Sequence, residues 1–227
     1  MKKFIFFALL QLFSVSSFAA IQLEATRVIY NSGSSSASLS LKNESDQNYM
    51  LQSWLENEDS SSNATIPMQV VPPIMRIDAG KEATLRFIYA GHGLPTNRES
   101  LFWINLQEIP PAAKDANTLQ IAVHSRLKLF YRPQGLNTTL DKEVQKLAWK
   151  QSGNKLVVTN KGPMYISLNR LHLKKGSAQD IYLDMVSPFS DRTFTLPANT
   201  HIGATVSFSY VNDFGGTSEV NDFPVNK

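Results

Sequence analysis

The sequence has no cysteine among its 227 residues. This absence excludes disulfide bonds, thiolate metal sites and a cysteine nucleophile. Charged residues make up only 18% and the formal net charge is +3, which is too little to indicate nucleic acid binding from total charge. Glycine and proline, at 11 each, are too few for a collagen-like or linker-dominated chain. The 42% of hydrophobic residues fits a globular protein with one large domain or two of about 100 residues.

Long apolar runs are also missing, apart from one at the N-terminus. Lys2 and Lys3 precede an apolar run over residues 4–13, and the small-residue site Ser17-Phe18-Ala19 follows. This order is typical of a secretory signal peptide, and we expect residues 1–19 to be removed on export. The run is shorter than the ~20 residues that a membrane-spanning helix needs, which disfavours the alternative of a transmembrane anchor.

The rest of the sequence alternates between apolar and polar residues with period two, which predicts β-strands. Leu85, Phe87 and Tyr89, for example, alternate with Thr84, Arg86 and Ile88, and Val206-Ser207-Phe208 shows the same pattern. Turn signals separate the runs at a spacing of roughly 8–15 residues, as in a β-sandwich. The one helix-like stretch, residues 141–148, fits equally well a connection that leads into a strand. We therefore predict an all-β fold.

A domain boundary is expected near residues 137–146. Arg132-Pro133 ends a long strand, Gly135 breaks the chain and residues 137–142 are polar. The predicted domains are residues 20–140 and 141–227. Each has a length that suits one immunoglobulin-like β-sandwich of about seven short strands.

The segment 117–132 contains no turn residue, so it predicts an unusually long strand. At ~3.3 Å per residue it would span about 50 Å, several times the usual strand length. Leu119, Ile121 and Val123 share one parity in its first half. This half either runs along an open edge, where a partner can add a strand, or is buried as part of a long core strand.

Several motifs occur in order over almost the whole sequence after the signal. The motifs are TRVIY at 26–30, PPIMRI at 72–77, LPTNRESLFWIN at 94–105, EIPP at 108–111, LKLFYRP at 127–133 and VNDFGG at 211–216. Together they resemble the periplasmic pilus chaperones of the PapD type, and the short spacing between Pro110-Pro111 and Ile121 is similar to the short-loop branch of that family.

The resemblance implies two immunoglobulin-like domains at an angle, with a cleft between them, and it implies roles for particular residues. Arg27 and Lys128 match the pair that binds the C-terminal carboxylate of a pilus subunit. The apolar residues of the long strand that enter the groove of the subunit match Leu119, Ile121 and Val123. An ionic network at the domain junction is implied for Glu99, Arg132 and Asp213.

The function implied by the resemblance is that of a periplasmic chaperone. It would fold and cap pilus subunits by donor-strand complementation and deliver them to an outer-membrane usher, and the free protein could associate with itself. The resemblance implies no cofactor and no metal, and no nucleic acid or small-molecule substrate is expected. We expect the protein not to be an enzyme, because the sequence lacks a nucleophile elbow, a phosphate-binding loop and histidines at metal spacing.

Two other protein classes fit an exported β-sandwich. A structural pilus subunit or adhesin-like protein would typically carry a cysteine pair, which this sequence lacks. A secreted hydrolase would need clustered acid and base groups at loop tips, and none stands out. Without the resemblance, Arg27 and Lys128 would be read as ordinary solvated surface charges. Glu99, Arg132 and Asp213 could likewise each be solvated, and isolated surface ion pairs contribute little stability.

Overall fold

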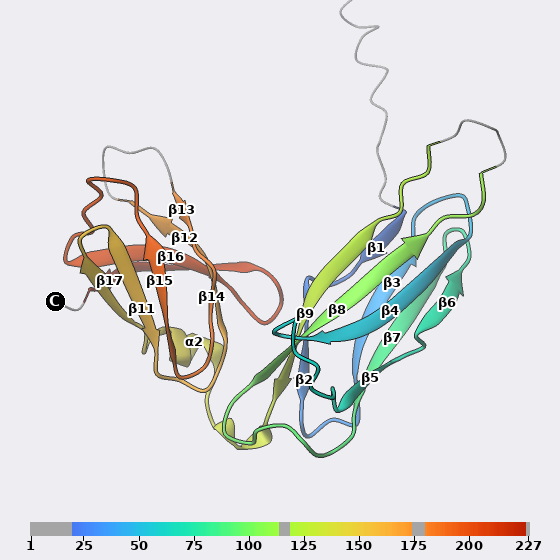
Figure 1. Cartoon of the computed structure of the whole chain (residues 1–227), viewed down its shortest axis with the longest axis horizontal. Coiled ribbons are helices and arrows are strands. Elements are labelled where there is room, and N and C mark those ends of the chain that lie inside the picture. The colour runs from blue at the N-terminus through green and yellow to red at the C-terminus, as the bar shows by residue number, and fades with distance from the viewer. Residues whose placement is uncertain (1–19, 114–118, 174–179, 226–227) are drawn as a thin grey trace, which may run out of the picture.

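The computed structural model describes residues 20–113, 119–173 and 180–225. It confirms the predicted all-β fold, with two β-sandwich domains inclined to each other (Figure 1). The expected signal peptide, residues 1–19, lies outside the described residues.

The N-terminal domain packs two sheets face to face. One sheet has the strand order β1-β3-β7-β5 and the other β2-β9-β8-β4-β6. All their pairs are antiparallel except β2 with β9, which is parallel. The bounds of the strands in the first sheet are β1 Ile21–Leu23, β3 Ala37–Asn43, β7 Glu82–Tyr89 and β5 Met68–Val71. Those of the second are β2 Arg27–Asn31, β9 His124–Arg132, β8 Ser100–Ile109, β4 Tyr49–Asn57 and β6 Ile74–Ile77.

The period-two alternation of these strands forms the core between the sheets. Leu39, Leu85 and Phe87 point inward from the first sheet and are fully buried, and Ile104 and Leu129 do so from the second. Because successive side chains of a strand point to opposite faces, the neighbours of these residues lie on the outer faces. The outer face of the second sheet therefore carries the residues that meet the other domain.

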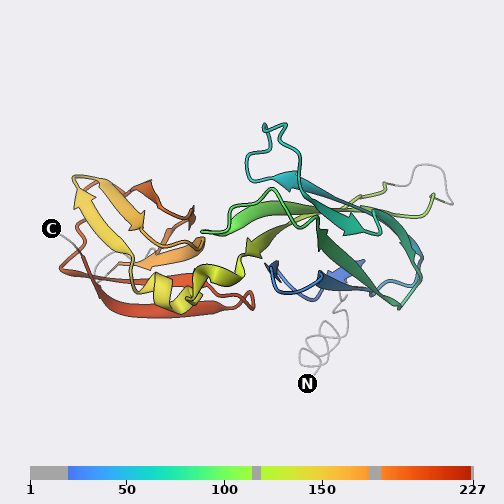
Figure 2. The same ribbon diagram turned by 90° about the horizontal axis from the view of Figure 1, so that it is seen from below.

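A short linker joins the two domains (Figure 2). It consists of a 3₁₀ turn, η1 (Gln134–Leu136), and one helical turn, α2 (Leu140–Val144). The Thr139 hydroxyl caps the start of α2 by accepting a hydrogen bond from the amide of Lys142. Strand β10 follows at Ala148–Ser152, so the sequence 141–148 forms a short helical turn that leads into a strand.

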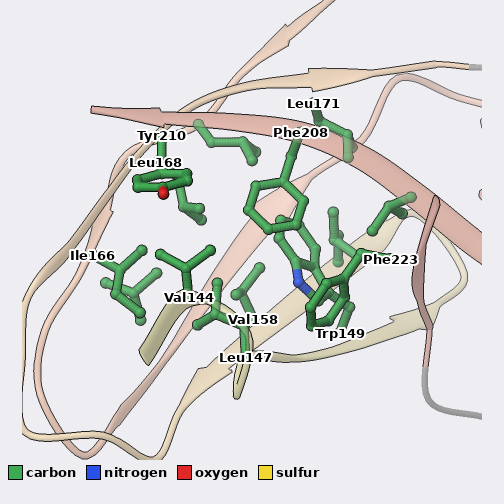
Figure 3. Close-up of a cluster of buried hydrophobic side chains, with 14 of the residues drawn as sticks. Val144, Leu147, Trp149, Val158, Ile166, Leu168, Leu171, Phe208, Tyr210 and Phe223 are labelled. Atoms are coloured by element: carbon green, nitrogen blue, oxygen red, sulfur yellow. The ribbon is translucent and has the colours of Figure 1, made fainter. Parts of the chain in front are cut away.

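The C-terminal domain has a three-stranded sheet of order β10-β11-β15 and a second sheet of order β13-β12-β16-β17, with β14 also paired to β12. Its core fills the space between these sheets and the linker helix (Figure 3). Trp149 packs on Phe208, with 4.7 Å between the ring centroids. The remaining strand bounds are β11 Lys155–Asn160, β12 Ile166–His172, β13 Ile181–Tyr182, β14 Met185–Val186, β15 Ser190–Thr195, β16 Thr205–Val211 and β17 Thr217–Pro224.

Trp149 should be far more important for stability than Trp54. Trp149 is fully buried, whereas Trp54 is half-buried on the outer face of β4. We expect Trp149→Ala to lower the free energy of unfolding by about 3–5 kcal/mol, because it removes a large buried side chain and leaves a cavity. Trp54→Ala should cost clearly less. Urea denaturation followed by circular dichroism measures both, and equal losses would contradict the assignment of Trp149 to the core.

Candidate functional site at the domain junction

The parallel pair of β2 and β9 brings Arg27 next to Lys128. The two residues are register partners, as are their successors Val28 and Leu129. Val28 and Leu129 are buried in the N-terminal core, so Arg27 and Lys128 lie on the opposite face, toward the C-terminal domain. Two residues that are about a hundred positions apart in the sequence thus place two cations side by side.

Arg27 is held against the C-terminal domain. Its Nη1 donates hydrogen bonds to the carbonyl oxygen of Val211 at 3.2 Å and to the Ser167 hydroxyl at 3.4 Å. Its Nε is buried and has no hydrogen-bond partner within the described residues. Burial lowers the pKa of Arg27, and the negative charges of Asp213 and Glu99 oppose this effect. An unpaired buried donor is costly, so an anion that reached it would be stabilised.

Lys128 is half-buried beside Arg27, and its Nζ lies 5.8 Å from the ring centroid of Trp103. In the part of the chain that the structure describes, this ammonium group has no hydrogen bond or ion pair. Burial lowers the pKa of Lys128, and the positive charge of Arg27 lowers it further. Two adjacent cations, one of them without an ion-pair partner among the described residues, form a site at which a carboxylate gains charge-assisted hydrogen bonds.

An ion-pair network lies close to these cations and joins the two domains. The Arg132 guanidinium contacts Glu99 at 2.6 Å and both carboxylate oxygens of Asp213 at 2.6 and 2.8 Å. These carboxylates raise the pKa of Arg132 although its burial acts in the opposite direction. Burial raises the pKa of Glu99, which is only 3% exposed, and Arg132 opposes that rise. The structure therefore brings together Glu99, Arg132 and Asp213, the three residues that the resemblance assigns to a network.

Leu119, Ile121 and Val123 precede β9 and lie outside its sheet. Their exposed fractions are 86%, 73% and 44%, so the alternative of a long core strand with both halves buried is wrong. The regular strand begins only at His124. Just before it, the carbonyl of Val123 still accepts a hydrogen bond from the amide of Glu108. The strand is thus nine residues long instead of the predicted sixteen, and an exposed apolar segment precedes it.

The outer edge of β9 is only partly covered. On one side β9 pairs with β8 from His124 to Tyr131, whereas on the other it pairs with β2 only from Lys128 onward. Upstream of Lys128, the described residues leave this second edge without a neighbouring strand. Unpaired backbone groups at such an edge are able to bind an added strand.

Tyr165 and Glu58 also contribute to the junction, and sequence reasoning missed both. The Tyr165 hydroxyl donates to Oε2 of Glu58 at 2.6 Å, and its ring packs near Phe130. Neither residue stands out in the sequence. Only the turn signal at Gly162-Pro163, just before Tyr165, indicated that a strand begins there.

The described residues contain no group of three His, Asp or Glu side chains that could hold a metal ion. None of the helices in these same ranges has the length and hydropathy needed to cross a membrane.

Comparison with known families assigns both halves of the chain. Residues 20–137 match the family described as pili and flagellar-assembly chaperone, PapD N-terminal domain, and residues 142–222 match the C-terminal domain of the pili assembly chaperone PapD. This protein belongs to the PapD family of pilus assembly chaperones. The resemblance inferred from the motifs is therefore confirmed, and the alternative of a pilus subunit or adhesin is not supported. PapD-type proteins are chaperones, which are not a class of enzymes.

Relatives and solved structures agree with this assignment. The probable fimbrial chaperone YadV of Escherichia coli is 39% identical over 92% of this chain and 92% of its own length, and the chaperone FimC of the same species is 35% identical over 87% and 81%. A structure of Salmonella enterica SafA pilin in complex with the SafB chaperone matches with a TM-score of 0.79 and 32% identity, covering 90% of this chain and 95% of the other. The crystal structure of YadV matches with a TM-score of 0.75 and 35% identity, covering 89% and 98%.

We expect Asp213→Ala to lower the free energy of unfolding by about 1.5–3 kcal/mol, because it removes two charge-assisted hydrogen bonds from a half-buried guanidinium. Asp191→Ala is the matched control, since Asp191 is exposed on β15 of the same domain. Thermal melts of both variants measure the difference. If their midpoints agree, Asp213 is an ordinary turn residue.

Proposed function

We propose that this PapD-type chaperone holds a pilus subunit in the cleft between its domains. It would bind the C-terminal carboxylate of the subunit with Arg27 and Lys128 and complete the fold of the subunit with residues 119–123. One observation carries the proposal: Arg27 and Lys128 lie side by side where β2 begins, and the edge of β9 just upstream is open and leads to exposed apolar side chains. The SafB relative, which is solved in complex with the SafA pilin, supports it.

The carboxylate anchor would set where the partner strand begins. Lys128 and Leu119 are nine positions apart, so about 30 Å of extended chain separates the anchor from the far end of the apolar segment. A terminal carboxylate fixed at Arg27 and Lys128 therefore determines which partner residue lies opposite each of Leu119, Ile121 and Val123. A slip by one residue would turn every partner side chain to the opposite face.

The apolar segment supplies the other half of the recognition. Leu119, Ile121 and Val123 keep the parity of Leu127 and Leu129, which point into the N-terminal core. The segment thus extends a core-facing row of side chains beyond its own core. A partner whose sandwich lacks one strand would bury this row in its own hydrophobic groove, while backbone hydrogen bonds along the edge provide affinity.

The cellular setting follows from the family and the N-terminal sequence. Residues 1–19 would act as a cleaved signal peptide that exports the protein to the periplasm. There the chaperone would transfer its subunit to an outer-membrane usher. No cofactor or catalytic step takes part in this proposal. In the absence of a subunit, the same open edge could pair with a second copy of the chain.

Lys128→Ala should abolish stable subunit complexes and leave the chaperone folded. Removing one charged partner from a desolvated contact with the carboxylate costs a few kcal/mol of binding free energy. Lys150→Ala, at an exposed position of β10, is the control. The test is co-purification of the tagged protein from the periplasm, with the bound proteins identified by mass spectrometry. Recovery equal to that of wild type at equal expression would show that Lys128 is not an anchor.

Ile121→Asp should greatly reduce the recovery of complexes, because it would place a carboxylate in the apolar groove of the partner. Ala122→Asp adds the same charge at a neighbouring exposed position of the opposite parity and should have a much smaller effect. Ala122 is a cleaner control than Gln120, because the Gln120 amide donates to the carbonyl of Pro111. Equal losses for the two aspartate variants would rule out strand donation with this parity.

A further inference from the structure

Tyr165 contacts the N-terminal domain in three separate ways, although it belongs to the C-terminal domain. Its backbone amide donates to Oε2 of Glu99 at 2.8 Å, and its ring lies 5.7 Å from that of Phe130. Its hydroxyl donates to Oε2 of Glu58 at 2.6 Å. With Leu101, Phe130 and Met185, Tyr165 forms a small buried cluster that is separate from both domain cores.

Glu58 reaches this cluster from the loop that follows β4. Besides Tyr165, its carboxylate accepts a hydrogen bond from the Ser187 hydroxyl at 3.3 Å, so it binds two side chains of the C-terminal domain. Its backbone carbonyl accepts from Nε1 of Trp103 at 3.2 Å. Trp103 is the register partner of Lys128 on the neighbouring strand, and its ring faces the Lys128 ammonium. Glu58 thus joins the C-terminal domain to the strand face that carries the anchor.

The alternation of side chains at the start of β12 places Tyr165 on the same face as a residue that contacts Arg27. Ile166 and Leu168 point into the C-terminal core, so Tyr165 and Ser167 share the opposite face, toward the N-terminal domain. Ser167 is the residue whose hydroxyl accepts from Nη1 of Arg27. The same short segment therefore carries both the contact with Glu58 and a contact with the anchor.

We propose that the Tyr165 hydroxyl and Glu58 form a second interdomain latch, beside the Arg132 network, that positions the C-terminal domain against Arg27. The Arg132 network is bound through Asp213 in the turn after β16 and, by way of Glu99, through the backbone amide of Tyr165. The latch adds the Tyr165 side chain and Ser187, in the loop before β15. Two attachments at different elements fix an angle between two bodies better than one does. Burial and the Glu58 charge raise the pKa of Tyr165, so the phenol remains a donor at neutral pH.

The absence of cysteine permits a direct test of this latch. Ser38→Cys on β3 and Ser152→Cys on β10 place one spin label at an exposed position of each domain. In this background, Tyr165→Phe removes only the hydroxyl and keeps the ring and the backbone bond to Glu99. We expect Tyr165→Phe to shift and broaden the interspin distance distribution of the free protein relative to wild type.

Tyr182→Phe is the matched control, because Tyr182 is an exposed tyrosine of the same domain, and it should leave the distribution unchanged. Glu58→Ala should reproduce the effect of Tyr165→Phe, and Glu58→Gln should restore part of the wild-type distribution because its amide oxygen still accepts a hydrogen bond. A Tyr165→Phe distribution that coincides with that of wild type would overturn the latch.

The functional part of this inference rests on the proposed subunit binding and is measured separately. Tyr165→Phe should lower the recovery of co-purified subunit several-fold while the thermal midpoint stays close to that of wild type. A shifted distance distribution with full recovery of subunit would overturn the positioning role. The distance measurement needs no subunit. Failure of the proposed function would instead appear as unchanged recovery with Lys128→Ala.

Discussion

The parallel pairing of β2 with β9 is the constraint on which the arrangement of the site depends. Its register places Arg27 beside Lys128, and its end leaves the rest of the β9 edge uncovered. Because β2 spans only Arg27–Asn31, it covers the edge downstream of the cations and not upstream. A strand that entered from the open side would thus meet a positive charge where β2 begins. The proposed anchor and the proposed donor edge are in this sense two consequences of one short strand.

Each domain has a hydrophobic core of its own, so the junction does not have to supply a core and can be small and polar. Only four buried hydrophobic residues form the cluster at the junction of the described domains. Such a contact area alone would allow the domains to move relative to each other. The ion pairs of Arg132 add directional bonds, and they also place two carboxylates near Arg27, where they offset part of the unfavourable burial of a second guanidinium.

The sequence predicted the parts of the fold that depend on local alternation. The strands follow from period two, and the two sandwiches from period two together with the spacing of the turn signals. Alternation also puts Leu127 and Leu129 on one face, which the structure shows to be the core face. The meeting of Arg132 with Asp213, 81 positions apart, was expected only from the family resemblance. Tyr165 and Glu58 could not be predicted, because a single hydrogen bond across 107 positions leaves no periodic trace in either segment.

The true start of β9 was missed for a reason that lies in the neighbouring strand. In the register of Gln107 with His124, positions 121 and 120 would lie opposite Pro110 and Pro111. Hydrogen-bonded pairs alternate in an antiparallel ladder, so after the bond from the amide of Glu108 to Val123 the next amide of β8 to donate would be that of residue 110. Proline has no amide hydrogen, so Pro110 cannot form this bond, and the apolar segment leaves its own sheet at this point. Its backbone and its side chains then remain accessible to a partner, at the cost of an exposed hydrophobic row in the free protein.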